Sequence, residues 1–305
     1  MIVPEAALGS TASPIERFHV LTVGAGVVGH AEGIALRGHG HDVAFSDVDE
    51  LVLSQRRTEG FPTMPITGLG LVGIDVVLVS VPTPTSAGEI DLRHLEAAVA
   101  TIGDALGRAS SSDPERYRVV IVRSTVPPGT TEDIVIPLLE AEAGLQAGLD
   151  FGVCVSPEYL RQRNAVSDSI TPRVVVIGQL DDRSGDAAER LNAGFGCPIY
   201  RVPIREAEFQ KYAHNLCNAS KISLFNELRR VAIAIGVDAE HVFGLVAQSA
   251  EAMWNAEYGT RDLGPYGGAC LPKDLEAFLS WADQQDLELP VLSAVRQSNY
   301  PAQTR

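Results

Sequence analysis

Apolar residues in the first two thirds of the chain gather in short continuous runs, separated by longer amphipathic stretches. Continuous apolar runs are typical of strands in a parallel sheet covered on both faces. Strands are expected at residues 19–23, 42–46, 75–81, 118–123, 151–155, 173–177 and, at an edge, 198–202. Helices are expected between them, ending at 38–40 and spanning 49–59, 92–108, 131–143 and 186–192. This alternation predicts an α/β fold with a doubly wound parallel sheet.

The pattern becomes helical throughout from about residue 204. One helical pattern without glycine or proline runs over residues 206–235, and it carries a mostly polar stripe: Glu208, Lys211, Asn215, Ile222 and Asn226. The stripe is either a solvated face or a polar site, and asparagine, a poor residue for helix interiors, favours the site. A glycine-rich turn at 264–274 precedes a last helical segment at 275–299. The predicted organisation is a loose arm at 1–17, a sheet domain at 18–203 and a helical domain at 204–305.

A glycine-rich turn also follows the first predicted strand. Gly24-Ala25-Gly26-Val27-Val28-Gly29 is a G-x-G-x-x-G sequence. Its glycines permit a tight turn (Gly24), close approach of a pyrophosphate (Gly26) and close packing of the helix on the strand (Gly29). Asp47, at the tip of the second strand, can accept hydrogen bonds from both hydroxyls of a ribose and would repel a 2′-phosphate. These features predict a Rossmann-type domain that binds NAD rather than NADP.

Charge and apolar patterning exclude several classes of partner. The 305 residues carry a net charge of −15, which argues against binding to nucleic acid or to an anionic membrane. The apolar runs are too short to span a bilayer, and residues 1–17 lack the features of a secretory signal. The four cysteines form neither a C-x-x-C pair nor a zinc-ligand spacing, so we expect no metal site, no disulfide framework and a cytoplasmic setting.

One cysteine is a candidate nucleophile. Cys154, Cys197 and Cys217 lie in apolar contexts and are expected to be small buried hydrophobes. Cys270 instead follows a Gly-Gly turn and precedes a predicted helix start, a setting that favours a thiolate. Asp274 falls in the first turn of that helix.

Three further motifs follow predicted strands, where ligands bind in open α/β sheets. They are VPTPT at 81–85, STVPPGT at 124–130 and SPEYL at 156–160. With these, with GAGVVG and Asp47, and with AEFQKYAHN at 207–215, NEL at 226–228 and YGGACLPKD at 266–274, the chain resembles the UDP-glucose/GDP-mannose dehydrogenase family. The matching stretches span residues 20 to 300 in the family's order, and the last motif is the most specific.

The resemblance implies oxidation of a sugar 6-hydroxymethyl group to a carboxylate with two NAD, through a thiohemiacetal and a thioester. Cys270 would be the nucleophile. Lys211 and Asn215 would stabilise oxyanions. Glu158 and Asp274 would manage protons or position water, with Thr125 holding that water. The residues implied to contact NAD are Gly24, Gly26, Val27, Val28, Gly29, Asp47, Val81, Pro82, Thr83, Ser124, Thr125, Glu158 and Lys273. The resemblance also implies a homodimer through the 206–235 helix, whose apolar side includes Leu216, Ile222 and Phe225.

Three departures from the family pattern bear on the chemistry. The SPE motif continues as SPEYLRQRN, so Gln162 replaces a second acid, and a glutamine cannot take a proton from water. The link at about residues 60–74 is short. The chain stops where a second α/β domain that grips the nucleotide would begin, so either it is a fragment or the substrate is held without that domain.

Three functions stay open. The first is an NAD-dependent oxidoreductase that acts on a sugar hydroxyl of a nucleotide sugar or related compound. The second is a redox-neutral lyase that retains NAD, oxidises a nucleoside or small sugar transiently, eliminates water and returns the hydride. The third is a non-catalytic NAD-binding dimerisation module, which the joint presence of Cys270, Lys211, Asn215 and Asp274 disfavours.

Overall fold

The computed structural model describes residues 16–86, 88–260, 265–267 and 270–299. The chain divides into two compact units, Met1–Ala213 and His214–Arg305, and each is described by itself. All but the last two residues of the predicted arm at 1–17 lie outside the described residues, as do residues 264, 268 and 269 of the predicted turn at 264–274. No helix within the described ranges is long and apolar enough to cross a membrane.

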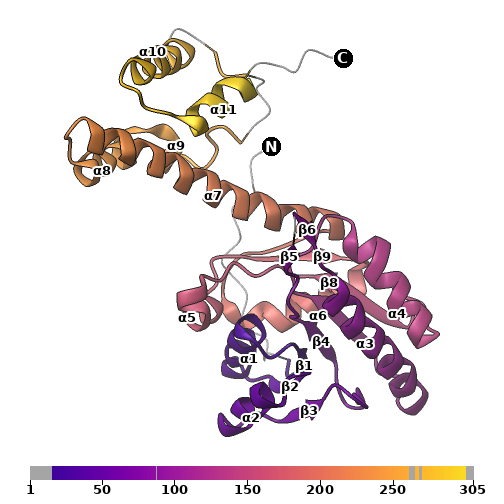
Figure 1. Cartoon of the computed structure of the whole chain (residues 1–305). Coiled ribbons are helices and arrows are strands. Elements are labelled where there is room, and N and C mark those ends of the chain that lie inside the picture. Colours follow the sequence, from indigo (N-terminus) through magenta and orange to yellow (C-terminus); the bar gives the residue numbers. More distant parts are fainter. Residues whose placement is uncertain (1–15, 87, 261–264, 268–269, 300–305) are drawn as a thin grey trace. The chain divides into compact units, whose positions relative to one another are not determined.

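The first unit is built on an eight-stranded sheet (Figure 1). Its order is β10-β9-β8-β7-β4-β1-β2-β3, and the strands from β3 to β8 are parallel. The strands are β1 (His19–Val23), β2 (Asp42–Asp47), β3 (Thr63–Pro65), β4 (Val76–Val79), β7 (Arg118–Val122), β8 (Phe151–Val155), β9 (Val175–Gln179) and β10 (Ile199–Pro203). A separate two-stranded hairpin joins β5 (Thr85–Ser86) to β6 (Glu89–Ile90). The predicted α/β fold with a doubly wound sheet is confirmed in its central part.

Helices cover both faces of this sheet, because successive strand residues point to opposite sides. On one face Val77 and Val79 pack with α3 (Arg93–Ser112) and α4 (Ile136–Ala143). On the other, Val76 and Leu78 pack with α1 (Val27–Gly38), α2 (Glu50–Thr58) and α6 (Asp182–Asn192). A short helix, α5 (Ala165–Ile170), contacts α1, and a π-helical turn, Thr131–Val135, leads into α4.

The end of the sheet corrects the prediction of an all-parallel arrangement. β9 pairs with β8 antiparallel, Val155 opposite Gly178, and β10 then runs parallel to β9. Between β8 and β9 the chain forms the short α5 and a 3-10 turn (Gln162–Asn164), and it returns antiparallel at the end of β8 instead of crossing the sheet face. Because the last residues of β9 pair with the last residues of β8, β10 also ends near the carboxyl end of β8.

Three local features differ from the expected elements. Residues 63–65 form an edge strand, β3, where no strand was expected. The helix expected at 92–108 continues as far as Ser112, and the hydroxyls of Ser111 and Ser112 donate to carbonyls one turn back. The last helical segment is two helices, α10 (Leu271–Gln284) and α11 (Pro290–Asn299). Asp286, with φ of 55°, and Pro290 interrupt it.

The second unit is helical. It contains most of α7 (Ile204–Ala234), which begins in the first unit, together with α8 (Ala239–Ser249), α9 (Glu251–Trp254), α10 and α11. A small apolar core joins Val231 of α7 to Ala282 of α10 and to Leu289. Phe225 of α7 packs edge-on against Phe243 of α8, with ring centroids 4.9 Å apart.

Candidate active site

The glycine turn between β1 and α1 has the geometry of a phosphate cradle. Gly24 has φ of +94°, and a side chain there would collide with the Ser80 carbonyl of the next strand connection. A Cβ on Gly29 would collide with the Gly24 carbonyl, so these residues bring helix and strand together. Gly26 has open space, with no atom within 4 Å of an added Cβ. Gly26 also caps α1 without a side-chain hydrogen bond, which leaves backbone N–H groups available to an anion.

Asp47 holds this turn in place from the tip of β2. Its Oδ2 accepts a hydrogen bond from Ala25 N at 2.7 Å, and its Oδ1 accepts one from Asp49 N at 2.9 Å. A carboxylate has about four acceptor positions, so each oxygen keeps one for a ribose hydroxyl. Val27, the first residue of α1, is 56% exposed beside this turn. The turn, the helix start and Asp47 together fit a dinucleotide.

The loops after β4 and β7 are bonded to each other. Thr83 Oγ1 donates to the Thr125 carbonyl at 2.8 Å, and Ser124 Oγ donates to the Val81 carbonyl at 2.7 Å. Both loops leave the carboxyl ends of adjacent parallel strands, so the motifs VPTPT and STVPPGT lie at one edge of the sheet. Pro82 lies within the first of these loops. The sequence-predicted residues Val81, Thr83, Ser124 and Thr125 are thereby brought together.

A buried ion pair joins the loop after β8 to the start of α7. Lys211 Nζ lies 3.0 Å from Glu158 Oε1 and also donates to the Glu158 backbone carbonyl. The two side chains are 6% and 15% exposed. The other oxygen of Glu158 accepts from Leu160 N at 2.6 Å, so the carboxylate is fixed at both ends. The ammonium group of Lys211 is therefore fixed at the carboxyl edge of the sheet.

The polar stripe of α7 is not one continuous site. Glu208 is 1% exposed, and its carboxylate accepts from the backbone N–H groups of Gly129 and Thr131. It therefore caps the helical turn that follows STVPPGT, a role that its sequence position did not reveal. Asn215, Ile222 and Asn226 are exposed, and all three belong to the second unit.

A second buried ion pair escaped the sequence analysis. Arg123 donates to Glu32 Oε2 at 2.7 Å, with the two side chains 8% and 6% exposed. Arg123 also donates to Ser156 Oγ at 3.0 Å, and Ser169 Oγ donates to Glu32 at 3.1 Å. The network ties the helix of the glycine turn to the ends of β7 and β8. The only signal in the sequence is a charge directly after an apolar strand and another within an apolar helix.

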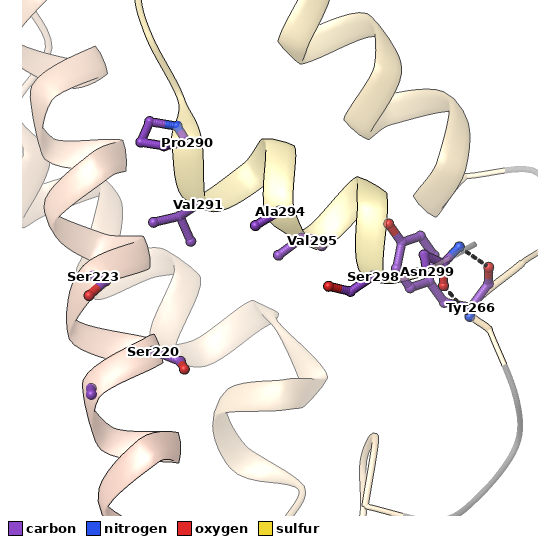
Figure 2. A pocket seen from close by; sticks show the side chains of 10 residues that line it. Ser220, Ser223, Tyr266, Pro290, Val291, Ala294, Val295, Ser298 and Asn299 are labelled. Atoms are coloured by element: carbon purple, nitrogen blue, oxygen red, sulfur yellow. Dashed lines mark hydrogen bonds between the residues drawn. The ribbon is translucent and has the colours of Figure 1, made fainter. Parts of the chain in front are cut away.

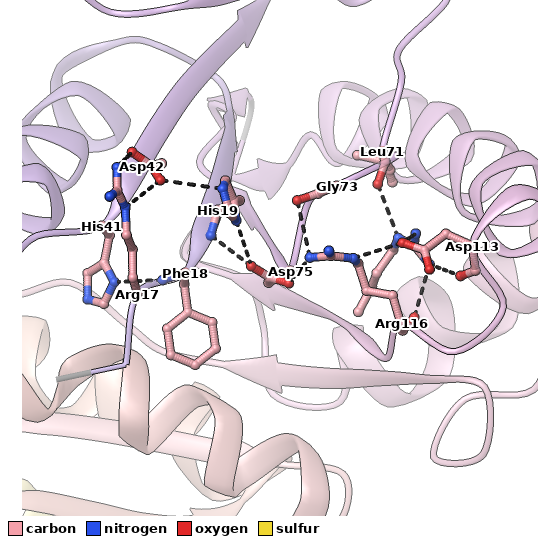
Figure 3. Close-up of polar contacts among 11 residues, drawn as sticks. Arg17, Phe18, His19, His41, Asp42, Leu71, Gly73, Asp75, Asp113 and Arg116 are labelled. Carbon is pink, nitrogen blue, oxygen red and sulfur yellow. Dashed lines mark hydrogen bonds and ion pairs between the residues drawn. The ribbon is translucent and has the colours of Figure 1, made fainter. Parts of the chain in front are cut away.

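The amino edge of the sheet carries a different set of charges (Figure 3). His19, which begins β1, lies 3.4 Å from Asp42 and 3.3 Å from Asp75, and Arg116 pairs with Asp75 and Asp113. These residues precede or begin parallel strands, so they lie at the edge opposite the glycine turn. Their charges are paired with one another, as expected of a structural network.

The second unit supplies the candidate nucleophile. Cys270 is exposed and is the N-cap residue of α10, and its carbonyl accepts from Asp274 N at 2.8 Å. Lys273 and Asp274 form an exposed ion pair with each other.

The unit also has a hollow of about 730 Å³ between α7 and α11, lined by Ser220, Ser223, Tyr266 and Asn299 among others (Figure 2).

The other cysteines differ in burial. Cys154 is fully buried in β8, and burial raises the pKa of its thiol to about 12. Cys197 is half-buried, and burial raises the pKa of its thiol as well. Cys217 is exposed on α7, so the prediction that it is a buried hydrophobe is wrong for this chain.

Among the described residues no group of three or more His, Cys, Asp or Glu side chains is placed to hold a metal ion.

Two family models match this chain. Residues 69–195 match the NAD binding domain of the UDP-glucose/GDP-mannose dehydrogenase family, and residues 205–300 match the central domain of the same family. The predicted resemblance and the predicted cofactor, NAD, are confirmed at the level of these domains.

Individual relatives show the same relationship. GDP-mannose 6-dehydrogenase of Azotobacter vinelandii is 34% identical over 297 residues, which cover 90% of this chain and 67% of that protein. That of Pseudomonas putida is 39% identical over 226 residues, 74% of this chain and 50% of that protein. The crystal structure of a ternary complex of GDP-mannose dehydrogenase from Pseudomonas aeruginosa superimposes with a TM-score of 0.83 at 33% identity, covering 92% of this chain and 68% of that one. The chain spans about half to two thirds of the length of the curated relatives it matches.

Proposed function

This chain belongs to the UDP-glucose/GDP-mannose dehydrogenase family, and from that premise we propose that it is an NAD-dependent oxidoreductase acting on a sugar hydroxyl of a nucleotide sugar. The observation that carries the proposal is the buried Lys211–Glu158 pair at the carboxyl edge of a sheet that also carries a glycine cradle. A buried charge is costly to keep, and this lysine is fixed at the carboxyl edge of the sheet, where ligands bind in open α/β folds, which supports a catalytic role.

The residues around the glycine turn fit NAD. The open space at Gly26 would admit a pyrophosphate to the N–H groups at the start of α1, and Asp47 keeps acceptor positions for a ribose. The tied loops of Thr83 and Ser124 would line the same edge. When bound, NAD supplies the oxidising power for the sugar carbon.

The chain's own groups would then handle charge and protons. Lys211, with its ammonium group fixed by Glu158, would stabilise negative charge on the sugar oxygen as the hydroxyl loses its proton, and Asn215 would add a neutral donor. Cys270, at the start of α10, would add to the aldehyde carbon through its thiolate, and the thiohemiacetal would become a thioester by loss of a hydride to a second NAD before water releases the carboxylate. Asp274, Glu158 and Thr125 would hold water for release of the carboxylate. Lys273 would contact the cofactor.

Two finer questions belong to the same proposal. Gln162 stands where the family has an acid, so release of the carboxylate from Cys270 is expected to be the slowest step. The redox-neutral lyase is the alternative, since it needs no hydrolysis. None of the relatives described above is a lyase, and we favour net oxidation with GDP-mannose or UDP-glucose as the first substrates to test.

The test follows NADH absorbance and product mass during incubation with NAD and each nucleotide sugar. Net oxidation gives two NADH for each carboxylate, and Cys270→Ser abolishes carboxylate formation. A product that has lost water without accumulation of NADH would establish the lyase instead. Absence of any turnover, with NAD bound, would favour the non-catalytic module.

A further inference from the structure

Two neighbouring residues of the loop after β8 hold two neighbouring residues of α7. Glu158 pairs with Lys211, and Tyr159, the next residue of the loop, donates from its hydroxyl to Gln210 Oε1. The ring of Tyr159 also lies beside the ammonium group, with Lys211 Nζ 5.5 Å from the ring centroid. All four residues belong to the first unit. The loop and the helix are therefore joined in one register next to Lys211.

Tyr159 is itself fixed at both ends of its side chain. Its apolar part packs against the core cluster on the α3 face of the sheet, which includes Val122 and Val155. Burial raises the pKa of its hydroxyl to about 12, against opposing effects of the Arg123 charge and of the hydrogen bond to Gln210. The phenol therefore keeps its proton at neutral pH and donates it to the amide oxygen of Gln210. The ring is thus fixed between the sheet core and α7.

The hydrogen bonds that Lys211 makes with the described residues use two of its three N–H donors. One donor bonds to the Glu158 carboxylate at 3.0 Å and one to the Glu158 backbone carbonyl. The face of an aromatic ring attracts a cation within about 6 Å of its centroid without accepting a conventional hydrogen bond. Contact with Tyr159 therefore limits the movement of the ammonium group and leaves the third N–H for a sugar oxygen.

We propose that Tyr159 is a positioning residue for Lys211. Its ring contacts the ammonium group directly, and its hydroxyl fixes the residue of α7 immediately before Lys211, Gln210. Tyr159 does not act on the reacting atoms. It keeps the third N–H of Lys211 at the place where the sugar oxygen gains negative charge. The inference rests on the proposed function, in which Lys211 stabilises that charge.

The test uses the full chain and separates the hydroxyl from the ring. Tyr159→Phe keeps the ring and removes the hydrogen bond, and Gln210→Ala removes the same bond from the other side. Tyr159→Leu removes the ring and the hydroxyl together. Tyr117→Phe is the matched control, because Tyr117 is also half-buried but directly precedes β7, at the opposite edge of the sheet. Thermal unfolding checks that each variant is folded.

Amine labelling measures how firmly Lys211 is held, without any substrate. The chain has three lysines, of which Lys211 is buried and Lys221 and Lys273 are exposed. Limiting acetic anhydride, followed by peptide mass, gives the labelling rate of Lys211 relative to the exposed lysines. This ratio is expected to rise about tenfold in Tyr159→Leu, for loss of the cation–π contact and the hydrogen bond. Tyr117→Phe is expected to keep the wild-type ratio.

The hydrogen bond is tested by a double-mutant cycle. Tyr159→Phe and Gln210→Ala are each expected to raise the labelling ratio of Lys211 about threefold, as for loss of one neutral hydrogen bond. Because both changes remove the same bond, the double variant is expected to equal either single variant.

Turnover shows whether a firmly held ammonium group matters for the reaction. With NAD and the nucleotide sugar that the wild type oxidises, kcat is expected to fall about 100-fold in Tyr159→Leu and about threefold in Tyr159→Phe. The KM for NAD is expected to stay unchanged in both, whereas a general loss of structure would raise it. Tyr117→Phe is expected to match the wild type in both constants.

The proposal is overturned if Tyr159→Leu keeps the wild-type labelling ratio of Lys211, or if it keeps the wild-type kcat. Additive effects of Tyr159→Phe and Gln210→Ala would overturn the role of their hydrogen bond. If Tyr159→Leu does not fold, the cycle of the two milder variants decides alone. Absence of turnover in the wild type with every nucleotide sugar would count against the proposed function, while the labelling would still decide whether Tyr159 positions Lys211.

Discussion

At the scale of single residues, replacing Asp47 changes two properties at once: the hydrogen bonds that fix the glycine turn and the charge that disfavours a 2′-phosphate. Its oxygens hold Ala25 N and Asp49 N, and the same charge would repel a 2′-phosphate. Asp47→Asn keeps the size, replaces one acceptor with a donor and removes the charge. We expect NAD to bind about tenfold more weakly, as for loss of one hydrogen bond to a charged group, and the preference over NADP to shrink. Calorimetry with both cofactors measures this.

Asp49→Asn is the control for that experiment. Asp49 caps α2 by accepting from Leu51 N at 2.8 Å, a bond that an asparagine oxygen can also accept. Its NAD affinity is expected to equal that of the wild type. Tighter binding of NADP than NAD by the wild type would refute the assignment of Asp47 to the ribose.

His41 makes the stability of the first unit depend on pH. It is 3% exposed; its Nδ1 accepts from Phe18 N at 3.2 Å (Figure 3), and its Nε2 lies 3.0 Å from the Leu191 carbonyl. Burial lowers the pKa of His41, against an opposing effect of the Leu191 carbonyl. The unfolded chain therefore takes up a proton near pH 6.5 that the folded chain resists. Stability present above that pH is lost as the pH falls, by at most about 1.4 kcal/mol per pH unit for one proton.

Urea unfolding between about pH 5 and pH 8 tests this dependence. His41→Asn does not titrate and is expected to flatten the acid side of the profile, leaving the part due to His30, whose pKa burial also lowers. His94→Asn, an exposed position on α3, is expected to keep the wild-type slope. An unchanged slope in His41→Asn would show that His41 does not resist protonation in the folded chain.

At the scale of elements, α7 is an example of what sequence patterning can and cannot establish. Its span was predicted within two residues at each end, because a long stretch without glycine or proline leaves few alternatives. The roles of its acids were missed. Glu208 and Glu227 bond to the backbone of segments more than 60 residues away, and nothing local to a helix distinguishes a buried cap from an exposed acid.

Removing Glu208 is expected to lower the free energy of unfolding more than removing its neighbour Glu206. Glu208→Ala leaves the buried N–H groups of Gly129 and Thr131 unpaired, at about 1–3 kcal/mol each, so the free energy of unfolding should fall by about 2–6 kcal/mol. Glu206→Ala, exposed on the same turn, should change it by about 0.5 kcal/mol or less. Chemical denaturation compares the two, and equal losses would contradict the capping role.

Strand direction was the other feature that patterning could not supply. Apolar runs identified seven of the eight strands of the sheet, including β9 and β10, because strands buried in a sheet consist mainly of apolar residues. The same run can pair in either direction, so the reversal at β9 could not be predicted from it. The short edge strand β3 has no apolar run at all.

At the scale of the whole molecule, the middle of α7 is unusually exposed for a helix with apolar residues. Leu216 and Ile222 are 60% and 61% exposed, and Phe225, which was expected to join them, is partly covered by Phe243. Exposed apolar stretches of this kind usually mark interfaces. We predict a homodimer through α7, with a mass in light scattering of about twice 32.5 kDa.

Glutamate at the interface tests that prediction. Leu216→Glu combined with Ile222→Glu is expected to give a monomer with unchanged secondary structure. Leu149→Glu, at a position 64% exposed in the first unit, should remain dimeric. A wild-type chain that is monomeric at micromolar concentration would exclude this interface.

The strand order has a consequence for how the chain is made. After β3, every strand of the large sheet is added at the same edge and in the order of synthesis, from β4 through β7, β8 and β9 to β10. Each new strand can therefore pair as soon as it leaves the ribosome, while the strand before it serves as a temporary edge. β8 is buried along its whole length in the finished sheet, so a ribosome that pauses before β9 exposes an apolar edge. β9 covers that edge, and β10, half-exposed and ending at Pro203, becomes the final edge strand before α7 emerges.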